Sequence, residues 1–209
     1  MTSEFSAAFW ESHWEERGND RALRPHPALE TEIADLAPGA ALEAGSGEGA
    51  EAVWLAERGW KVTAVDLSAR ALRRAGARFS DRSFAVPIEW LHADLTTWEP
   101  IHPFDLVTTF YAHPAMAQDA FYARLSRWVA PGGALLIVGH EEAGRLDAPR
   151  EAVHSHPSTA VTAPRRILSV LDEGEWTVST ADVRERAVGI PGGGTRMLRD
   201  VVVRATRRS

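Results

Sequence analysis

Short apolar runs alternate with amphipathic stretches through the middle of the chain. The runs that predict strands lie at residues 40–44, 61–66, 86–91, 104–110 and 134–138. Between most of them, apolar residues recur at the three- and four-residue spacing of a helix. These stretches predict helices at 49–58, from 68 to 79 and at 114–129. Strands and helices that alternate at this spacing predict a doubly wound α/β domain with a largely parallel sheet.

The two ends of the chain follow other patterns. Residues 4–17 carry aromatic side chains at helical spacing, and residues 28–36 predict a second short helix. Near the C-terminus, extended runs at 175–186 and 196–206 flank a glycine-rich turn, which predicts an antiparallel pair at the edge of the sheet. Residues 141–163 are rich in His, Pro, Ser and Ala without a period, and a loop of this length is often a functional cover.

These segments predict one domain over residues 1–209. Its expected parts are an N-terminal helical cap at 1–38, a cofactor-binding core at 39–140, and a substrate loop with a terminal β-hairpin at 141–209. A chain of 209 residues suits one substantial core better than two. No repeat and no internal linker divides it.

Composition narrows the class of protein. The net charge is −6 and no basic stripe is present, so we expect no nucleic-acid partner. No signal peptide and no long apolar stretch is visible, so we expect a cytoplasmic protein without a membrane span. The chain has no cysteine, which excludes disulfides and a cysteine nucleophile. His154 and His156 lack a third ligand at useful spacing, so we expect no metal site. The expected oligomeric state is a monomer or a homodimer.

A glycine-rich turn is the strongest candidate for a binding site. Gly45, Gly47 and Gly49 lie between an apolar run and a helical pattern, where backbone N–H groups can bind the polar part of a nucleotide-like cofactor. One interpretation is a dinucleotide site. The spacing from Gly45 to Ala50 fits G-x-G-x-x-G/A, and Asp66 lies about 20 residues on, where an acid binds ribose. The protein would then be an NAD(P)-dependent oxidoreductase.

A longer set of residues resembles the class I S-adenosylmethionine-dependent methyltransferases. It contains Glu43 with the three glycines, Asp66 in Val-Asp-Leu-Ser, and Asp94 in Ala-Asp-Leu. Phe104–Val107 is similar to the family's fourth strand, and Pro131-Gly132-Gly133 to the turn into its fifth strand. Five features in the family's order are more specific than the glycine pattern alone, and we favour this interpretation.

The resemblance covers residues 26–139 and, loosely, the terminal hairpin. It implies a Rossmann-like seven-stranded sheet, parallel except for one C-terminal antiparallel strand, and S-adenosylmethionine as cofactor. In the family, the acid matched by Asp66 holds the ribose and the acid matched by Asp94 holds the adenine. The implied cofactor-binding residues are Glu43, Ala44, Gly45, Ser46, Gly47, Asp66, Leu67, Asp94, Leu95 and Phe110. The aromatic N-terminal helix and compact chain resemble the small-molecule branch, near the tellurite-resistance and thiopurine methyltransferases.

Methyl transfer needs an in-line arrangement and the exclusion of water more than it needs a nucleophile of the enzyme. His113 and His140 follow the fourth and fifth strands and could take a proton from a small-molecule acceptor. Hydrogen-bonded loop histidines are the alternative interpretation. The expected substrate-side residues are Trp10, Trp14, His26 and Tyr111. A cofactor-binding protein without catalysis remains a third hypothesis.

Overall fold

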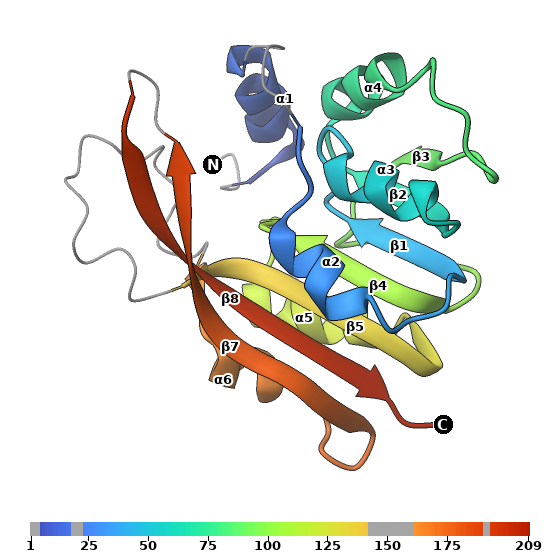
Figure 1. Cartoon of the computed structure of the whole chain (residues 1–209), viewed down its shortest axis with the longest axis vertical. Coiled ribbons are helices and arrows are strands. Elements are labelled where there is room, and N and C mark those ends of the chain that lie inside the picture. The colour runs from blue at the N-terminus through green and yellow to red at the C-terminus, as the bar shows by residue number, and fades with distance from the viewer. Residues whose placement is uncertain (1–4, 18–22, 142–160, 190–192) are drawn as a thin grey trace.

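A computed structural model describes residues 5–17, 23–141, 161–189 and 193–209. Figure 1 shows a central twisted sheet with helices on both faces and a long terminal hairpin at one edge. The elements in chain order are α1 (Ala7–Glu16), α2 (Pro27–Ile33), β1 (Ala40–Ala44), α3 (Ala50–Glu57), β2 (Lys61–Asp66), α4 (Ala69–Arg78), β3 (Glu89–His92), β4 (Phe104–Phe110), α5 (Gln118–Ser126), β5 (Val129–Glu141), β6 (Val161–Thr162), α6 (Pro164–Leu168), β7 (Trp176–Gly189) and β8 (Thr195–Arg207).

The sheet has the order β3-β2-β1-β4-β5-β8-β7, and the two-residue strand β6 pairs with β5. β8 is antiparallel to both of its neighbours, β5 and β7, whereas the other paired strands are parallel. The predicted fold class is therefore confirmed, with β6 as a short addition to the seven expected strands. The chain crosses between the halves of the sheet at β1 and β4, so the carboxyl ends of these strands border a crevice suited to a ligand.

Two apolar layers hold the helices on the sheet. Ala41 of β1 faces the layer that contains α2 and α3, whereas the next residue, Leu42, faces the layer that contains α5 and α6. Leu136 and Leu135 of β5 divide in the same way. Successive side chains on a strand point to opposite faces, so a strand covered on both sides must be apolar throughout. With the strands held between these layers, the carboxyl edge of the sheet lies below α1 (Figure 1).

Several predicted boundaries need correction. The helix predicted at 114–129 is confined to α5, because Ala117 is extended (φ −60°, ψ 132°) and Val129 already pairs with Phe104 as the start of β5. The strand predicted at 86–91 starts only at Glu89, since Pro87 has no N–H to donate to a ladder. The strand predicted at 134–138 extends over all of β5.

At the N-terminus the helices are shorter than predicted, at Ala7–Glu16 and Pro27–Ile33. The short helix α6 was not predicted. Most of the predicted cover, residues 142–160, lies outside the described residues, as does the middle of the hairpin turn. Among the described helices, none has the length and apolar character needed to cross a membrane.

Candidate active site

A cavity of about 450 Å³ lies between α1 and the carboxyl ends of β1, β2 and β4. Its size is within the usual range for sites that bind small molecules and cofactors. Most of the predicted site residues line it: Trp10, Trp14, Gly45, Ser46, Gly47, Asp66, Leu67, Asp94, Leu95, Phe110, Tyr111, His113 and His140. Residues from distant parts of the chain therefore meet at one edge of the sheet.

The glycine turn forms the floor of the cavity with its backbone. Gly45 has φ +81°, and a Cβ atom built on it would lie 2.4 Å from the Cβ atom of Ala112. Gly47 has φ +51°, and its built Cβ atom would lie 3.0 Å from Cζ2 of Trp14. A side chain would clash with Ala112 at the first position and crowd Trp14 at the second, and both positions have a backbone conformation that side chains disfavour. Glycine at both positions keeps the backbone open to a ligand.

Asp66 ends β2 and holds the glycine turn in place. Its Oδ2 atom accepts a hydrogen bond from Gly47 N at 2.8 Å, and its Oδ1 atom accepts one from Ser68 N at 2.8 Å. Burial raises the pKa of this carboxyl, and the two backbone donors oppose that shift. A carboxylate oxygen can accept more than one hydrogen bond, so Asp66 can also receive ligand hydroxyl groups at the cavity wall.

Asp94 and Leu95 follow β3 on the same side of the cavity. Asp94 Oδ1 accepts a hydrogen bond from Thr96 N at 2.8 Å, which closes a tight turn. Arg124 of α5 donates to the backbone oxygen of Leu95 at 2.8 Å. This turn is thus tied to α5, and both Asp94 and Leu95 line the cavity.

The opposite wall is aromatic. Tyr111, directly after β4, stacks on His140 with 4.4 Å between ring centroids. His113 is buried, and its ring centroid lies 6.1 Å from that of His140 and 5.5 Å from that of Phe5. Trp10 of α1 donates from its indole nitrogen to the backbone oxygen of His113 at 3.3 Å. The two predicted catalytic histidines therefore share one wall, and α1 closes over it.

Three predicted site residues do not line the cavity. Glu43 is buried in the sheet and accepts a hydrogen bond from the Thr108 hydroxyl. Burial, with the nearby carboxyl of Glu51, raises the pKa of Glu43 well above its usual range. Ala44 is fully buried. His26 lies behind the wall, with its ring 5.8 Å from that of Tyr111.

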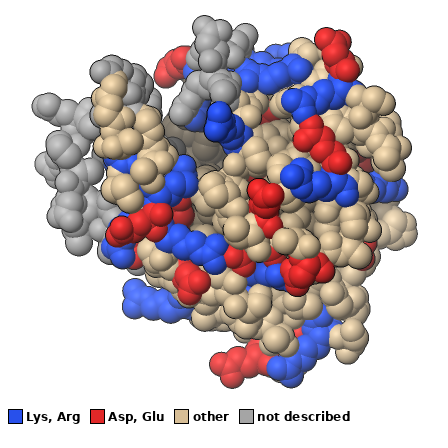
Figure 2. All heavy atoms as spheres, in the orientation of Figure 1, with Lys and Arg blue, Asp and Glu red and all other residues tan. Residues whose placement is uncertain are grey.

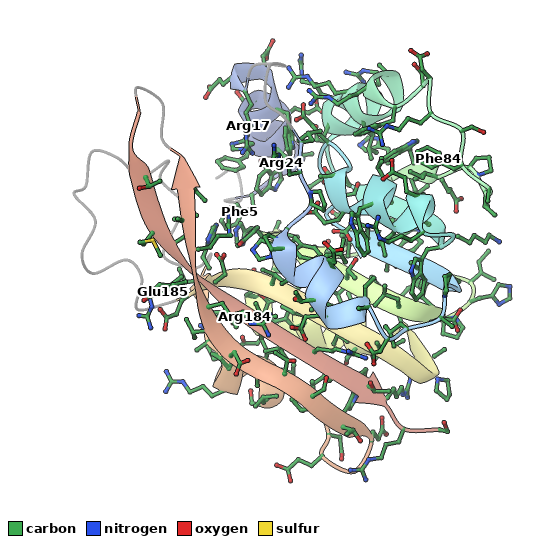
Figure 3. All side chains as sticks on the ribbon, viewed as in Figure 1. Phe5, Arg17, Arg24, Phe84, Arg184 and Glu185 are labelled. Atoms are coloured by element: carbon green, nitrogen blue, oxygen red, sulfur yellow. The ribbon has the colours of Figure 1, made fainter. Side chains whose placement is uncertain are left out.

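The cavity is lined by further residues that were not named as individual site residues, although Gly49, Ala50 and Ala93 belong to the predicted motifs. The additional residues are His13, Arg17, Leu23, Arg24, Glu48, Gly49, Ala50, Glu51, Ala93, Ala112, Pro114 and Phe121. His13, Arg17 and Arg24 lie in the predicted N-terminal helix and the link at 24–27, which were expected to border the pocket, but the sequence did not single out these three side chains. Figure 3 shows these arginines beside α1 above the strand ends. No group of side chains suited to a metal ion occurs in the described part of the chain.

Comparisons with known proteins relate part of this chain to a known family. Residues 41–133 match the family model of the methyltransferase domain. TehB from Haemophilus influenzae superposes with a TM-score of 0.69, at 15% identity, over 95% of this chain and 67% of that one. NodS from Bradyrhizobium japonicum WM9 with bound S-adenosyl-l-homocysteine superposes with a TM-score of 0.64, at 18% identity, over 95% of this chain and 98% of that one. Residues 41–133 thus match a methyltransferase domain, and the chain shares the fold of these methyltransferase structures.

Sequence relatives carry the same class name. A probable thiol methyltransferase 2 of Arabidopsis thaliana is 32% identical over 144 residues, which make up 66% of this chain and 64% of the plant protein. Uncharacterized methyltransferases of Mycobacterium bovis and Mycobacterium tuberculosis are 40% identical over 115 residues, 54% of this chain and 56% of theirs. The chain thus spans less than two thirds of the length of these curated relatives.

Proposed function

We propose that this protein transfers a methyl group from S-adenosylmethionine to a small molecule. The observation that carries the proposal is the meeting of the open glycine turn, Asp66 and Asp94 in one cavity. A net charge of −6 and the mixture of acidic and basic side chains in Figure 2 favour a small acceptor over a nucleic acid. A cytoplasmic location and a monomeric or homodimeric state stay predictions.

The residues present fit such a cofactor. The Asp66 carboxyl would hold the ribose hydroxyls, and Asp94 with Leu67 and Leu95 would hold the adenine. The backbone at Gly45 and Gly47 would face the amino-acid part. When bound, the cofactor supplies an electrophilic methyl group on a sulfonium. The protein then has to orient the acceptor, keep water away and, where needed, accept a proton.

The aromatic wall is the proposed acceptor side. The rings of Trp10, Tyr111 and Phe110 can exclude water and attract a sulfonium cation, with about 0.5–2 kcal/mol for a cation–π contact. His140 and His113 are the proposed bases for the acceptor's proton. A thiol is the acceptor class that we propose to test first, because its pKa of about 8.5 is low enough for histidine to generate the reactive thiolate. The name of the plant relative points the same way.

Calorimetric titration with S-adenosylhomocysteine tests the proposal directly. We expect saturable binding at one site, and methyl transfer from S-adenosylmethionine to benzenethiol by mass spectrometry. Binding of NAD in place of S-adenosylhomocysteine would establish the oxidoreductase alternative. Binding of S-adenosylhomocysteine without transfer to any thiol, hydroxyl or amine acceptor would establish a non-catalytic binding protein.

Asp66→Asn tests the ribose assignment. Hydrogen bonds to a charged carboxylate contribute about 1.5–3 kcal/mol, so we expect affinity for S-adenosylhomocysteine to fall by about 10- to 100-fold. Asp172→Asn is the matched control, because Asp172 also accepts from the backbone N–H two residues on, at 2.7 Å, but lies outside the cavity. Equal affinity in both variants would reject the assignment.

A further inference from the structure

A buried carboxylate lies directly behind the aromatic wall. Asp200 of β8 is 1% exposed, and its backbone pairs in register with that of His140 on β5. Its Oδ2 atom lies 3.2 Å from His26 Nε2 and accepts a hydrogen bond from Arg186 Nε at 2.8 Å. The Tyr111 hydroxyl is close enough to contribute to the lowered pKa of Asp200. One side chain of the terminal hairpin thus contacts the N-terminal link and the end of β4.

Arg186 of β7 closes this network. Its Nη2 atom donates to the Tyr111 hydroxyl at 3.1 Å. The Tyr111 ring then stacks on His140, the register partner of Asp200. His26 packs against the other side, with its ring 5.7 Å from Phe110 and 5.8 Å from Tyr111. These contacts surround Tyr111 and His140, the two cavity residues that the proposed acceptor would meet.

Tyr111 needs such support. Its φ is +54°, a conformation that costs a residue with a side chain free energy and persists where surrounding contacts impose it. Strain of this kind is common at ligand-binding positions. A buried ion pair is weak evidence for stability, because desolvation offsets much of the attraction, but it can favour one geometry over others. The network therefore fits a role in fixing the geometry of this wall.

We propose that Asp200 is a positioning residue for methyl transfer, which through His26 and Arg186 holds Tyr111 against His140 on the acceptor side of the cavity. This inference rests on the proposed function. Asp200 does not line the cavity, so it would act through its neighbours. Its contacts reach the wall that would orient the acceptor, whereas Asp66 ends β2 and Asp94 follows β3.

The experiment compares Asp200→Asn with wild type in two assays. Titration with S-adenosylhomocysteine reports the cofactor side, and we expect the affinities to agree within about 2-fold. Steady-state transfer to benzenethiol, phenol and aniline, one acceptor each for sulfur, oxygen and nitrogen, reports the acceptor side. There we expect kcat/KM to fall by about 10-fold or more, because a wall displaced by about 1 Å misaligns an in-line attack.

Two further variants separate positioning from folding. Tyr111→Phe keeps the ring on His140 but removes the hydroxyl that Arg186 binds, and we expect an intermediate loss with unchanged cofactor affinity. Glu185→Gln, the exposed neighbour of Arg186 on the hairpin in Figure 3, is the control and should match wild type. A purely structural role would lower kcat and the binding stoichiometry in proportion, with KM unchanged.

The outcomes distinguish the inference from the proposed function. Wild-type activity that persists within 2-fold in both Asp200→Asn and Tyr111→Phe overturns the inference alone. If Asp200→Asn does not fold, Tyr111→Phe decides by the same criterion. Wild-type protein that binds no S-adenosylhomocysteine, or methylates none of the three acceptors, overturns the proposed function and the inference with it.

Discussion

At Gly45 the site leaves no space for a side chain. Gly45→Ala would place a Cβ atom 2.4 Å from that of Ala112 at a φ of +81°. Backbone strain of this kind costs about 1–3 kcal/mol, so we expect a lower melting temperature and weaker binding of S-adenosylhomocysteine. Calorimetry measures both.

Gly76→Ala is the contrasting substitution. Gly76 lies in α4, and a Cβ atom built there meets no atom within 4 Å. Alanine in a helix is favoured over glycine by about 0.5–1 kcal/mol, so this variant should be slightly more stable and bind normally. Equal effects of the two substitutions would show that the turn tolerates a side chain.

At the scale of elements, one acidic side chain attaches α1 to the sheet domain. Glu11 Oε1 accepts from the Ser68 hydroxyl at 2.9 Å and from Arg70 N at 3.0 Å, at the start of α4. The Arg70 N–H, more than the other contacts, lowers the pKa of Glu11. An anion at a helix N-terminus is stabilised by the unpaired N–H groups there. This attachment holds Trp14 over the glycine turn.

Glu11→Gln should therefore weaken cofactor binding. The loss of a helix-terminal charge costs about 0.3–1 kcal/mol, which corresponds to about a 2- to 5-fold lower affinity for S-adenosylhomocysteine. Glu15→Gln is the control, since Glu15 is on the same helix, 3.6 Å from Arg70, but is 66% exposed. Titration at pH 7 compares them. Unchanged affinity in Glu11→Gln would show that α1 stays closed without this contact.

For the molecule as a whole, buried acids predict how stability depends on pH. Burial, with the Glu51 carboxyl nearby, raises the pKa of Glu43 above its ordinary value of 4.5. The folded protein then binds this proton more tightly than the unfolded chain does. The contribution of Glu43 to stability is full below about pH 4.5 and is lost as the pH rises through the raised pKa.

Glu43→Gln removes this dependence. We expect its melting temperature, relative to wild type, to be higher at pH 9 than at pH 5. Glu89→Gln is the matched control, because Glu89 also accepts a hydrogen bond from a threonine, Thr63, at 2.9 Å, but on an exposed part of β3. The difference in melting temperature between Glu89→Gln and wild type should be the same at both pH values. The same result for Glu43→Gln would show that the buried carboxyl does not titrate in this range.

Asp200 predicts the opposite dependence of stability on pH. Burial alone would raise the pKa of Asp200, but hydrogen bonds from His26, Arg186 and Tyr111 together lower it to about 2. Its stabilising effect is therefore present above pH 3.8 and is lost as the pH falls toward 2. Urea unfolding should show Asp200→Asn about 1–2 kcal/mol less stable than wild type at pH 6, with the gap closing near pH 2. A constant gap would contradict the lowered pKa.

Much of the architecture follows from local patterns. Apolar runs and helical spacing predicted the parallel core because each depends only on which face of one element is buried. The glycine turn and Asp66 were predicted for a similar reason, since a strand, a turn and a helix in succession determine their own geometry. Boundaries such as those of α5 and β3 were less well predicted, because helix and strand ends depend on capping and on partner strands.

The wall behind the acceptor side required the folded chain. His26 and Asp200 are 174 positions apart in sequence, and Tyr111 and Arg186 are 75 apart. Their contacts depend on the register of β8 against β5 and β7, and a slip of one residue would turn Asp200 to the opposite face. Periodicity predicts that the terminal strands pair but carries no information about which side chains face each other. The glycine turn and Asp66 could therefore be predicted from residues close in sequence, whereas the wall around Tyr111 and His140 forms only when distant strands pair.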